Sequence, residues 1–408
     1  MGEKKVLVQK YGGSSVATPD KIKAVARRIV AAKEQGYKVV AVVSALGDTT
    51  DELIKLARQI TDRPPRREMD MLLSTGEQVS ISLLAMAVDS LGEPVISLTG
   101  AQCGIITDAQ HTKARILEIQ ANRIQEELGK GKIVVVAGFQ GITSLNDITT
   151  LGRGGSDTTA VALAAVLEAE VCEIYTDVDG VYTADPRVVP EARKLEQISY
   201  GEMLEMARLG AGVMQPRAVE IGAQYGIPIH VRASFKDEPG TMIKGEEALE
   251  KEVVVTGVTH DTNVAKFVVV DVPDRPGVAA KIFSALADDG VNVDMIVQTN
   301  KRTGRTDMLF TVSKDDMEST KDIIEELCKE LGGERVIVNT DVAKVSIVGA
   351  GMVSNPGVAA RMFRALADEN INIQVISTSE IKVSCLIDAS LVVPAVQAIH
   401  KAFELHVG

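Results

Sequence analysis

Short, fully apolar runs alternate with helical stretches over the first 235 residues, and this pattern constrains the fold more than any other feature of the sequence. The runs read KVLVQ, YKVVAVVSA, KIVVVAGF, EVCEIYTDV and IPIHVRAS, and the helical stretches between them include residues 19–35 and 76–91. Strands that are apolar on both faces are typical of a mostly parallel sheet covered by helices on each side. The pattern therefore predicts an α/β domain over residues 1–245.

The rest of the chain contains an internal repeat. RPGVAAKIFSALADDGVNVDMIVQT, which begins at Arg275, returns eighty residues later as NPGVAARMFRALADENINIQVISTS. Each copy reads as strand, helix, strand, strand, helix, which is the order of a ferredoxin-like unit. We therefore expect two small domains, at 250–338 and 339–408, after a polar linker at 236–252. The second copy ends too early to supply a last strand, so the run VVVTGVT before the first copy could complete it and interleave the two domains.

Charge and composition exclude several classes of partner. The formal net charge is −12, which disfavours nucleic acid and anionic membranes as partners. No apolar run approaches about 18 residues, and the start MGEKKVLVQKYGG lacks the apolar core of an export signal. The four cysteines are far apart and have no metal-ligand spacing, so we expect reduced core thiols and no resident metal site. These features together predict a cytoplasmic protein.

The string LGRGGSDTTAVALAAVLEAE joins a glycine-rich turn to a helix. Gly154 and Gly155 would bring backbone N–H groups close to a ligand, Ser156 adds a hydroxyl, and Arg153 offers a forked donor for a carboxylate or phosphate. Asp157 caps or opens the helix. A helix cap alone would need only Ser or Asp, so the combination favours an anionic ligand at this helix N-terminus.

A second glycine pair follows the first expected strand, in QKYGGSSV. Gly12, Gly13 and Ser14 could cradle an anion with backbone N–H groups and a hydroxyl, and Lys10 would place a positive charge over it. The alternative is an ordinary Gly-Gly turn with a solvated lysine. The two common nucleotide-loop fingerprints, G-x-x-x-x-G-K-[ST] and G-x-G-x-x-G, are absent from the sequence.

The segments SALGDTTDEL and LSTGEQVS carry further polar candidates. Ser44 leaves the second strand, and Thr49 or Thr50 is placed to cap the next helix. Glu77 is expected inside or beside a helix N-terminus. There it either caps the helix or holds the amino group of a substrate.

A turn-rich loop, YTDVDGVYTADPR, follows the buried strand that begins at Val171. Asp177, Asp179, Asp185 and Arg187 gather at its carboxyl end, where open α/β sheets bind ligands. The D-x-D-G pattern lacks the remaining ligands of an EF-hand, which argues against calcium.

Six of these motifs in this order, KYGGSSV, SALGDTTDEL, STGEQ, GFQG, TTLGRGGSDTTA and YTDVDGVYTADPR, resemble the aspartokinases, and the repeats resemble ACT regulatory domains. The resemblance implies an amino-acid-kinase fold, a mostly parallel sheet between helices, followed by two ferredoxin-like ACT domains. It implies transfer of a phosphoryl group from ATP to the side-chain carboxylate of L-aspartate, giving 4-phospho-L-aspartate. That reaction is the first step toward lysine, threonine, methionine and isoleucine. Mg²⁺ would arrive with the nucleotide.

The resemblance also implies a role for each matching residue. Lys10 would stabilise the transferring phosphoryl group, and Asp157 would orient the catalytic lysine or the nucleotide. The expected ATP-binding residues are Lys10, Gly12, Gly13, Ser14, Ser44, Thr176, Asp177, Tyr182, Asp185 and Arg187. The expected aspartate-binding residues are Ser44, Thr49, Glu77, Arg153, Gly154, Gly155 and Ser156.

In the repeats, VPDRPGVAA and NVDMIVQ match the segments that hold amino-acid effectors in ACT domains. The expected effector residues are Asp274, Gly277, Ala279, Asn292, Val293, Asp294 and Gln298. The second copy has Asn355 and Gln374 in place of the two carboxylates, so we expect the first copy to lead the binding of lysine, threonine or both. ACT domains usually pair across subunits, which implies a homo-oligomer, alone or with a separate ACT-only subunit.

One departure and two alternatives accompany this interpretation. Many aspartokinases carry a nucleotide-contacting lysine in the stretch that reads GAGVMQPR here, and this chain has Gly212 at that place; Arg217 or a backbone amide could substitute.

A kinase for glutamate or N-acetylglutamate is a second candidate function, disfavoured by STGEQ, GRGGSD and the double repeat. A catalytically idle amino-acid sensor is the third, disfavoured by the intact Lys10, Arg153 and Asp157.

Overall fold

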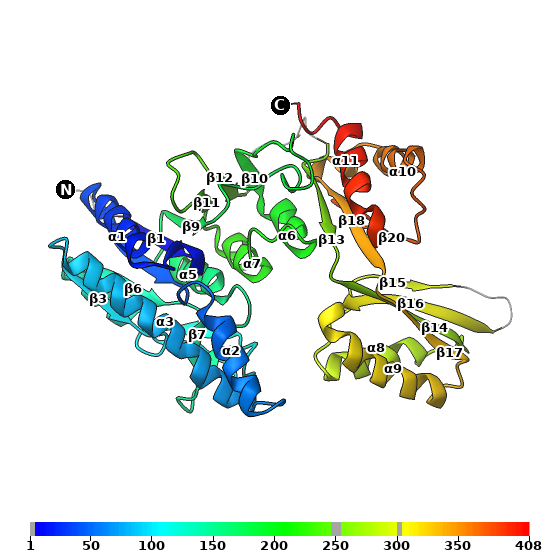
Figure 1. The fold of residues 1–408 in the computed structure, drawn as a ribbon, viewed down its shortest axis with the longest axis horizontal. Helices are drawn as coiled ribbons and strands as arrows, with labels where there is room; N and C mark the ends of the chain where they lie inside the picture. The colour runs from blue at the N-terminus through cyan, green and yellow to red at the C-terminus, as the bar shows by residue number, and fades with distance from the viewer. Residues whose placement is uncertain (1–4, 246–253, 300–303, 408) are drawn as a thin grey trace. The chain divides into compact units, whose positions relative to one another are not determined.

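The computed structural model describes residues 5–245, 254–299 and 304–407, and these fall into two compact units (Figure 1). The first unit comprises Met1–Tyr182, Lys194–Arg208 and Gly212–Leu249. The second comprises Thr183–Arg193, Leu209–Ala211 and Glu250–Gly408. Two short segments of the N-terminal region, Thr183–Arg193 and Leu209–Ala211, thus belong to the same unit as the C-terminal repeats.

An eight-stranded sheet forms the centre of the first unit. Its order is β10 (Gln197–Ser199), β12 (Thr241–Lys244), β11 (Ile229–Ala233), β9 (Val171–Thr176), β1 (Val6–Tyr11), β2 (Lys38–Val43), β6 (Ile133–Ala137) and β3 (Val95–Leu98). The six strands from β11 to β3 are parallel to one another, and β12 runs antiparallel to β11. The five apolar runs all became strands of this sheet, as the sequence predicts.

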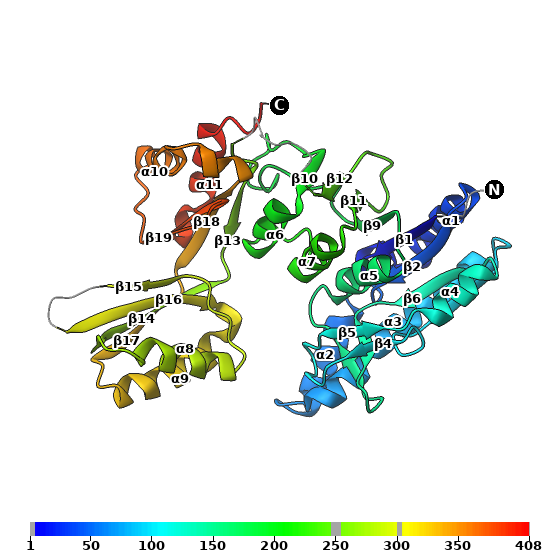
Figure 2. The same cartoon turned by 180° about the vertical axis from the view of Figure 1, so that it is seen from behind.

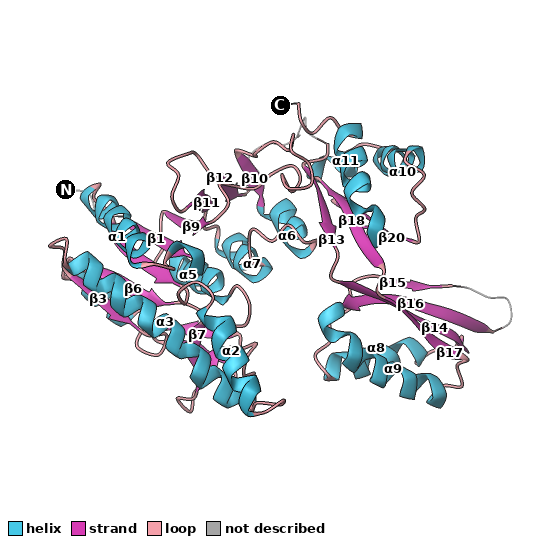
Figure 3. Cartoon of the chain, in the orientation of Figure 1, coloured by secondary structure: helices cyan, strands magenta, loops and turns pink. Residues whose placement is uncertain are grey.

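Helices cover both faces of the sheet (Figure 3). α1 (Pro19–Glu34) and α3 (Arg66–Asp89) pack on the face that carries Leu7 and Tyr11 of β1. α5 (Gly155–Val166) contacts β1 from the other face and is buried over most of its length, which suits its apolar sequence. The remaining helices of this unit are η1 (Gly13–Ser15), α2 (Thr49–Ile60), α4 (Asn122–Gly129), α6 (Tyr200–Arg208) and α7 (Pro216–Tyr225).

A smaller sheet accompanies the large one. Its order is β5 (Ile116–Ile119), β4 (Ile105–Thr107), β7 (Gln140–Ile142) and β8 (Ile148–Thr150). β8 packs against α3 and leads directly into the glycine-rich turn before α5.

Three local predictions were wrong. The helix expected at 76–91 begins at Arg66 instead, so Glu77 lies about three turns inside α3 rather than at its start. The N-cap of α2 is Asp48, and Thr49 is its first residue. The expected linker at 236–252 contains β12, because alternation in this segment buries Thr241 and Ile243 against the sheet; residues 246–252 lie outside the described part.

The length and composition of α3 alone would allow it to cross a membrane. In the fold, however, 44% of its most apolar window is buried inside the protein. The helix also carries Asp70 and Glu77 on its buried face. Its apolar character is therefore accounted for in part by packing on β3 and β6.

Each repeat in the second unit forms a four-stranded antiparallel sheet with two helices. The first has the order β15 (Ile296–Gln298), β16 (Arg305–Ser313), β14 (Val264–Pro273) and β17 (Arg335–Asn339), and the second has β13 (Gly257–Asp261), β18 (Val342–Val348), β20 (Lys382–Asp388) and β19 (Val375–Thr378). β13 precedes the first copy but pairs with β18 of the second, so the copies interleave. Val253, the first residue of the run expected there, lies outside the described residues.

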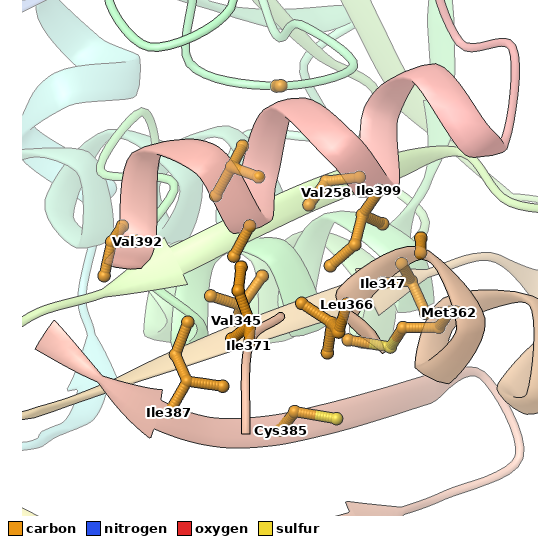
Figure 4. Packing of buried hydrophobic residues seen from close by; sticks show 14 of the residues in the cluster. Val258, Val345, Ile347, Met362, Leu366, Ile371, Cys385, Ile387, Val392 and Ile399 are labelled. Carbon is orange, nitrogen blue, oxygen red and sulfur yellow. The ribbon is translucent and has the colours of Figure 1, made fainter. Parts of the chain in front are cut away.

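The helices of each repeat cover one face of its sheet, as Figure 2 shows for α8 and α9. The first copy uses α8 (Val278–Asp288) and α9 (Met317–Glu330), preceded by η2 (Lys314–Asp316). The second uses α10 (Val358–Asp368) and α11 (Val392–Ala402), with η3 (Ala350–Ser354) and η4 (Ala389–Leu391). Residues of α10, α11, β18 and β20 make the second core (Figure 4). Ala184 and Val189 of the segment Thr183–Arg193 join that core.

Candidate active site

The predicted catalytic segments meet where the order of the large sheet reverses. From β1 the chain passes to β2 on one side, while β9 lies on the other side of β1. The carboxyl ends of parallel strands at such a point form the usual ligand crevice of open α/β sheets. Gly12 N donates to Tyr175 O across this point (3.2 Å), which ties the loop after β1 to the loop after β9.

Lys10 and Asp157 form an ion pair at this edge. The Lys10 Nζ lies 2.7 Å from Asp157 Oδ1, and each side chain is 11% exposed. Alternation along β1 turns Lys10 toward α5, whereas its neighbours Gln9 and Tyr11 lie on the α1 face. The two predicted catalytic residues are therefore brought together by strand register and by the first turn of α5.

The glycine pair after β1 permits a close backbone approach. A Cβ on Gly13 would lie 2.9 Å from both Ala45 O and Gly47 O, so only glycine fits between the loops after β1 and β2. Gly47 N donates to Gly13 O (3.0 Å). Ser14 lies in the same short helical turn, η1. This is the compact backbone cradle that a phosphate group requires.

The helix α5 begins at a left-handed glycine. Gly154 is the N-cap, with φ 65°, and a Cβ there would meet the Gln215 side chain at 2.9 Å. Arg153 is exposed at the turn, while Ser156 is buried and accepts a hydrogen bond from the Ser44 hydroxyl (2.9 Å). The N–H groups of Gly155 and Asp157 donate to Gly152 O (3.0 Å) and Gly154 O (3.1 Å), but the positive end of the helix dipole and the adjacent arginine suit an anion.

Glu77 lies beside the loop after β2 with one oxygen unpartnered. Its side chain is 2% exposed, and its Oε1 accepts from Ala45 N (3.1 Å). Oε2 is buried without a hydrogen-bond partner in the described part of the chain. Burial raises the pKa of Glu77 to about 7, although the Ala45 N–H opposes this. A buried carboxylate with a free oxygen favours a cationic ligand group.

The other predicted site residues divide between the two units. Thr49 donates to Leu46 O (2.6 Å) and opens α2. Thr176 donates to Asp177 (3.0 Å) at the end of β9, and Tyr182 donates to Asp179 (2.9 Å) in the following loop. Asp185 and Arg187 belong to the second unit and pair with each other (2.8 Å).

The side chain of Arg217 binds backbone carbonyl groups. Its guanidinium donates to Leu151 O and to Ala114 O, at 3.0 Å each. Burial lowers the pKa of Arg217 from its ordinary value. The guanidinium of Arg217 therefore already has two backbone partners near the Arg153 turn.

Sequence reasoning missed a buried polar network on the α1 face of the sheet. Glu173 of β9 accepts from Gln9 (2.9 Å), Tyr175 (3.0 Å) and Arg232 (3.0 Å), and the Tyr11 ring stacks on Tyr175 at 4.9 Å. These side chains come from neighbouring strands at matching register. In the sequence, this network is indicated by the polar residues that alternate with apolar ones in β9 and β11.

In the first repeat, four of the predicted effector residues lie at the start of α8 and three follow its end. Gly277 is the N-cap with φ 96°, and Ala279 lies in the first turn. Gln298 donates to Asp274 (3.1 Å). Asn292, Val293 and Asp294 form the turn between α8 and β15.

Each repeat contributes a lysine that contacts a polar residue of the other repeat. Lys266 of the first donates to Gln374 of the second (2.5 Å), and Lys344 of the second pairs with Asp294 of the first. Lys344 is buried, so Asp294 already neutralises a cation of its own chain. An apolar cluster that includes Val264 and its counterpart Val342 lies between the repeats.

The described residues hold no group of three or more His, Cys, Asp or Glu side chains arranged for a metal ion. Mg²⁺ usually keeps several waters and binds through substrate phosphates and one or two carboxylates. The glycine cradle with Lys10 and the carboxylates Asp157 and Asp177 fits a metal that is delivered with a nucleotide.

Comparison with known families agrees with this geometry. The amino acid kinase family matches residues 5–233, and ACT domains match residues 266–330 and 345–403. An aspartokinase from Mycolicibacterium smegmatis is 51% identical over 98% of this chain and 96% of its own length. One from Bacillus sp. MGA3 is 52% identical over 98% of this chain and 97% of its own.

Solved structures give the same result. The crystal structure of E. coli aspartokinase III in complex with aspartate and ADP covers 98% of this chain and 99% of its own, at 25% identity and a TM-score of 0.83. The aspartate kinase from Synechocystis is 49% identical, with a TM-score of 0.55, and the match covers 98% of this chain and 69% of that one. The expected fold, an amino-acid-kinase domain followed by two ACT domains, is confirmed.

Proposed function

Because the chain belongs to the aspartokinases of the amino acid kinase family, we propose how its own residues divide the work of the reaction. An aspartokinase transfers a phosphoryl group from ATP to aspartate, and ACT domains regulate it. Phosphoryl transfer needs no covalent enzyme intermediate, so positioning and neutralisation of charge supply most of the catalysis. The observation that carries the assignment is the Lys10–Asp157 pair at the sheet edge (2.7 Å).

Lys10 stabilises the negative charge of the transferring phosphoryl group, and Asp157 holds the lysine in place. Gly13 and Ser14 donate to the phosphates, and Gly12, whose N–H donates to Tyr175 O (3.2 Å), ties this loop to the end of β9. Thr176, Asp177 and Tyr182 contact the nucleotide. Asp157 and Asp177 would hold a Mg²⁺ ion delivered with the nucleotide, and the ion would neutralise charge on the phosphates.

Aspartate is held at both ends of its backbone. Arg153 and the N–H group of Gly154 bind its α-carboxylate beside Gly155, whose own N–H donates to Gly152 O (3.0 Å), and Glu77 binds its ammonium group. Ser44, Thr49 and Ser156 complete the pocket. The unpartnered Oε2 of Glu77 supports this role, because a ligand ammonium would satisfy the buried oxygen.

The repeats bind an amino-acid effector, lysine, threonine or both, near the N-terminus of α8. E. coli aspartokinase III has been solved in complex with lysine and aspartate, and this chain carries the same kind of repeat. We expect a homo-oligomer assembled through the ACT domains, alone or with a separate ACT-only subunit. The enzyme would act in the cytoplasm, at the first step toward lysine, threonine, methionine and isoleucine.

ADP release from Mg-ATP tests this proposal, with L-aspartate, L-glutamate or N-acetyl-L-glutamate as acceptor and with or without lysine plus threonine. We expect turnover with aspartate only, suppressed by one or both effectors. Turnover that ignores the effectors would reduce the repeats to assembly. No turnover with any acceptor would favour the sensor alternative.

A further inference from the structure

A second buried carboxylate of α3, Asp70, is not explained by the roles above. Asp70 is 0% exposed and precedes Glu77 by seven residues, so the two share one face of the helix. Thr150 Oγ1 donates to Asp70 Oδ1 (2.5 Å), and Thr112 N donates to both carboxylate oxygens (3.1 Å each). The ring Nδ1 of His111 lies 2.7 Å from Oδ2.

These contacts join two segments that are distant in the sequence. Thr150 ends β8 and precedes the Arg153 turn directly. Thr112 belongs to the loop between β4 and β5, and it has φ 71°, a left-handed conformation that a β-branched residue rarely adopts. Ala114 N donates to Thr150 O (2.9 Å). Asp70 therefore holds a strained loop and the end of β8 against the same helix.

The Arg153 turn depends on this support. Arg153 is exposed and stands between Gly152 (φ 81°) and Gly154 (φ 65°), so its own packing contributes little to its position. A Cβ on Gly152 would lie 3.1 Å from Thr112 O, which shows how closely the loop held by Asp70 approaches the turn. The position of Arg153 is thus set by the backbone before it, together with Gln215, whose side-chain amide donates to Arg153 O.

We propose that Asp70 is a positioning residue for the binding of aspartate. It fixes Thr150 and Thr112, and through them it places Arg153 at the distance from Glu77 that fits both ends of the substrate. One rigid helix, α3, then determines both halves of the pocket: Glu77 directly and Arg153 through Asp70. This inference rests on the role proposed above for Arg153.

The test is a comparison of Michaelis constants in the full-length enzyme. Asp70→Asn and Thr150→Val remove the carboxylate and the hydroxyl that meet at 2.5 Å, whereas Thr150→Ser retains a hydroxyl. We expect Asp70→Asn and Thr150→Val to raise KM for aspartate about tenfold to a hundredfold, because small misplacements of binding groups have effects of this size. KM for ATP stays within about twofold, and Thr150→Ser restores most of the aspartate affinity.

Glu127→Gln is the matched control. Glu127 is also a buried carboxylate, but it lies on α4 and pairs with Lys130 (2.7 Å) and Lys132 (2.6 Å), outside the proposed site. Its substitution is expected to change stability without changing KM for aspartate. If Asp70→Asn does not fold, the Thr150→Val and Thr150→Ser pair decides the question.

Arg153→Ala separates this inference from the function on which it rests. If Asp70 acts through Arg153, adding Asp70→Asn to Arg153→Ala raises KM for aspartate no further. If Arg153→Ala leaves that KM unchanged, the proposed clamp is wrong. If Arg153→Ala raises it but folded Asp70→Asn and Thr150→Val do not, the positioning role of Asp70 is overturned. An equal rise in KM for ATP, or a Ser variant as weak as the Val variant, also overturns it.

Discussion

The proposed role of the buried Glu77 carboxyl predicts that the binding of aspartate depends on pH near neutrality. Burial raises its pKa from an ordinary value of 4.5 to about 7. Only the ionised form attracts the ammonium group of aspartate. Between pH 6 and pH 8 its ionised fraction rises from about 0.1 to about 0.9, so kcat/KM for aspartate should rise about tenfold. The Glu77→Gln variant should bind aspartate weakly and show no such rise.

The same group should reduce stability at alkaline pH. A carboxyl whose pKa is raised on folding binds its proton more tightly in the folded state, so its contribution is complete below pH 4.5 and is lost as the pH rises through 7. Moving the pKa from 4.5 to about 7 corresponds to about 3 kcal/mol. Glu77→Gln should therefore be more stable than the unmodified protein at pH 8, by up to about 3 kcal/mol, and nearly equal to it at pH 4.5.

Two assays check this reasoning. Initial rates with saturating Mg-ATP and varied aspartate, from pH 6 to 8, give the kinetic profile of both proteins. Urea unfolding without substrates at pH 4.5 and 8 gives the free energies. A flat kcat/KM profile, or the same rise in Glu77→Gln, would refute the assignment of the ammonium site. A Glu77→Gln variant that is less stable at pH 8 would refute the burial argument.

Three further predictions concern other parts of the chain. Lys10→Ala should lower kcat by about a hundredfold or more, because it removes a group that stabilises transition-state charge; unchanged ADP release would show that the lysine has another role. Gly13→Ala should weaken ATP binding or prevent correct folding of the loops, since its Cβ would meet two backbone oxygens at 2.9 Å, and calorimetric titration with a non-hydrolysable ATP analogue measures the loss. Lys344→Ala should destabilise the repeats by about 1 kcal/mol, because it removes the ion-pair partner of Asp294, whose side chain is 37% exposed and can be hydrated, and Asp294→Asn in the same chain should recover part of that loss in urea unfolding.

Local pattern was sufficient for the family and for five of the eight strands of the large sheet, β1, β2, β6, β9 and β11. The apolar runs indicated these strands because parallel strands covered by helices on both faces are rich in apolar residues. The internal repeat indicated two copies of one small fold. It also indicated that the second copy lacks a last strand, which another segment must supply. The residues Lys10 and Asp157 were identified because their motifs are distinctive, although nothing in the sequence says that they touch.

Prediction from local pattern failed where the structure of a segment depends on another segment that packs against it. The polar segment before the repeats was expected to be a linker, yet Thr241–Lys244 pairs with β11 and becomes a strand. The start of α3 at Arg66 was missed, and with it the fact that Glu77 and Asp70 lie on one buried face of a single helix.

The sequence by itself determined which residues can bind phosphate, carboxylate and ammonium, since those capacities belong to the side chains and glycines. Only the tertiary structure decided which of them meet. Strand register places Lys10 on the α5 face, burial leaves Glu77 with an unpartnered oxygen, and contacts between segments far apart in the chain join Asp70 to the Arg153 turn. The distance between two side chains, their burial and their hydrogen-bond partners all depend on neighbours in space, and most of these neighbours are remote in sequence.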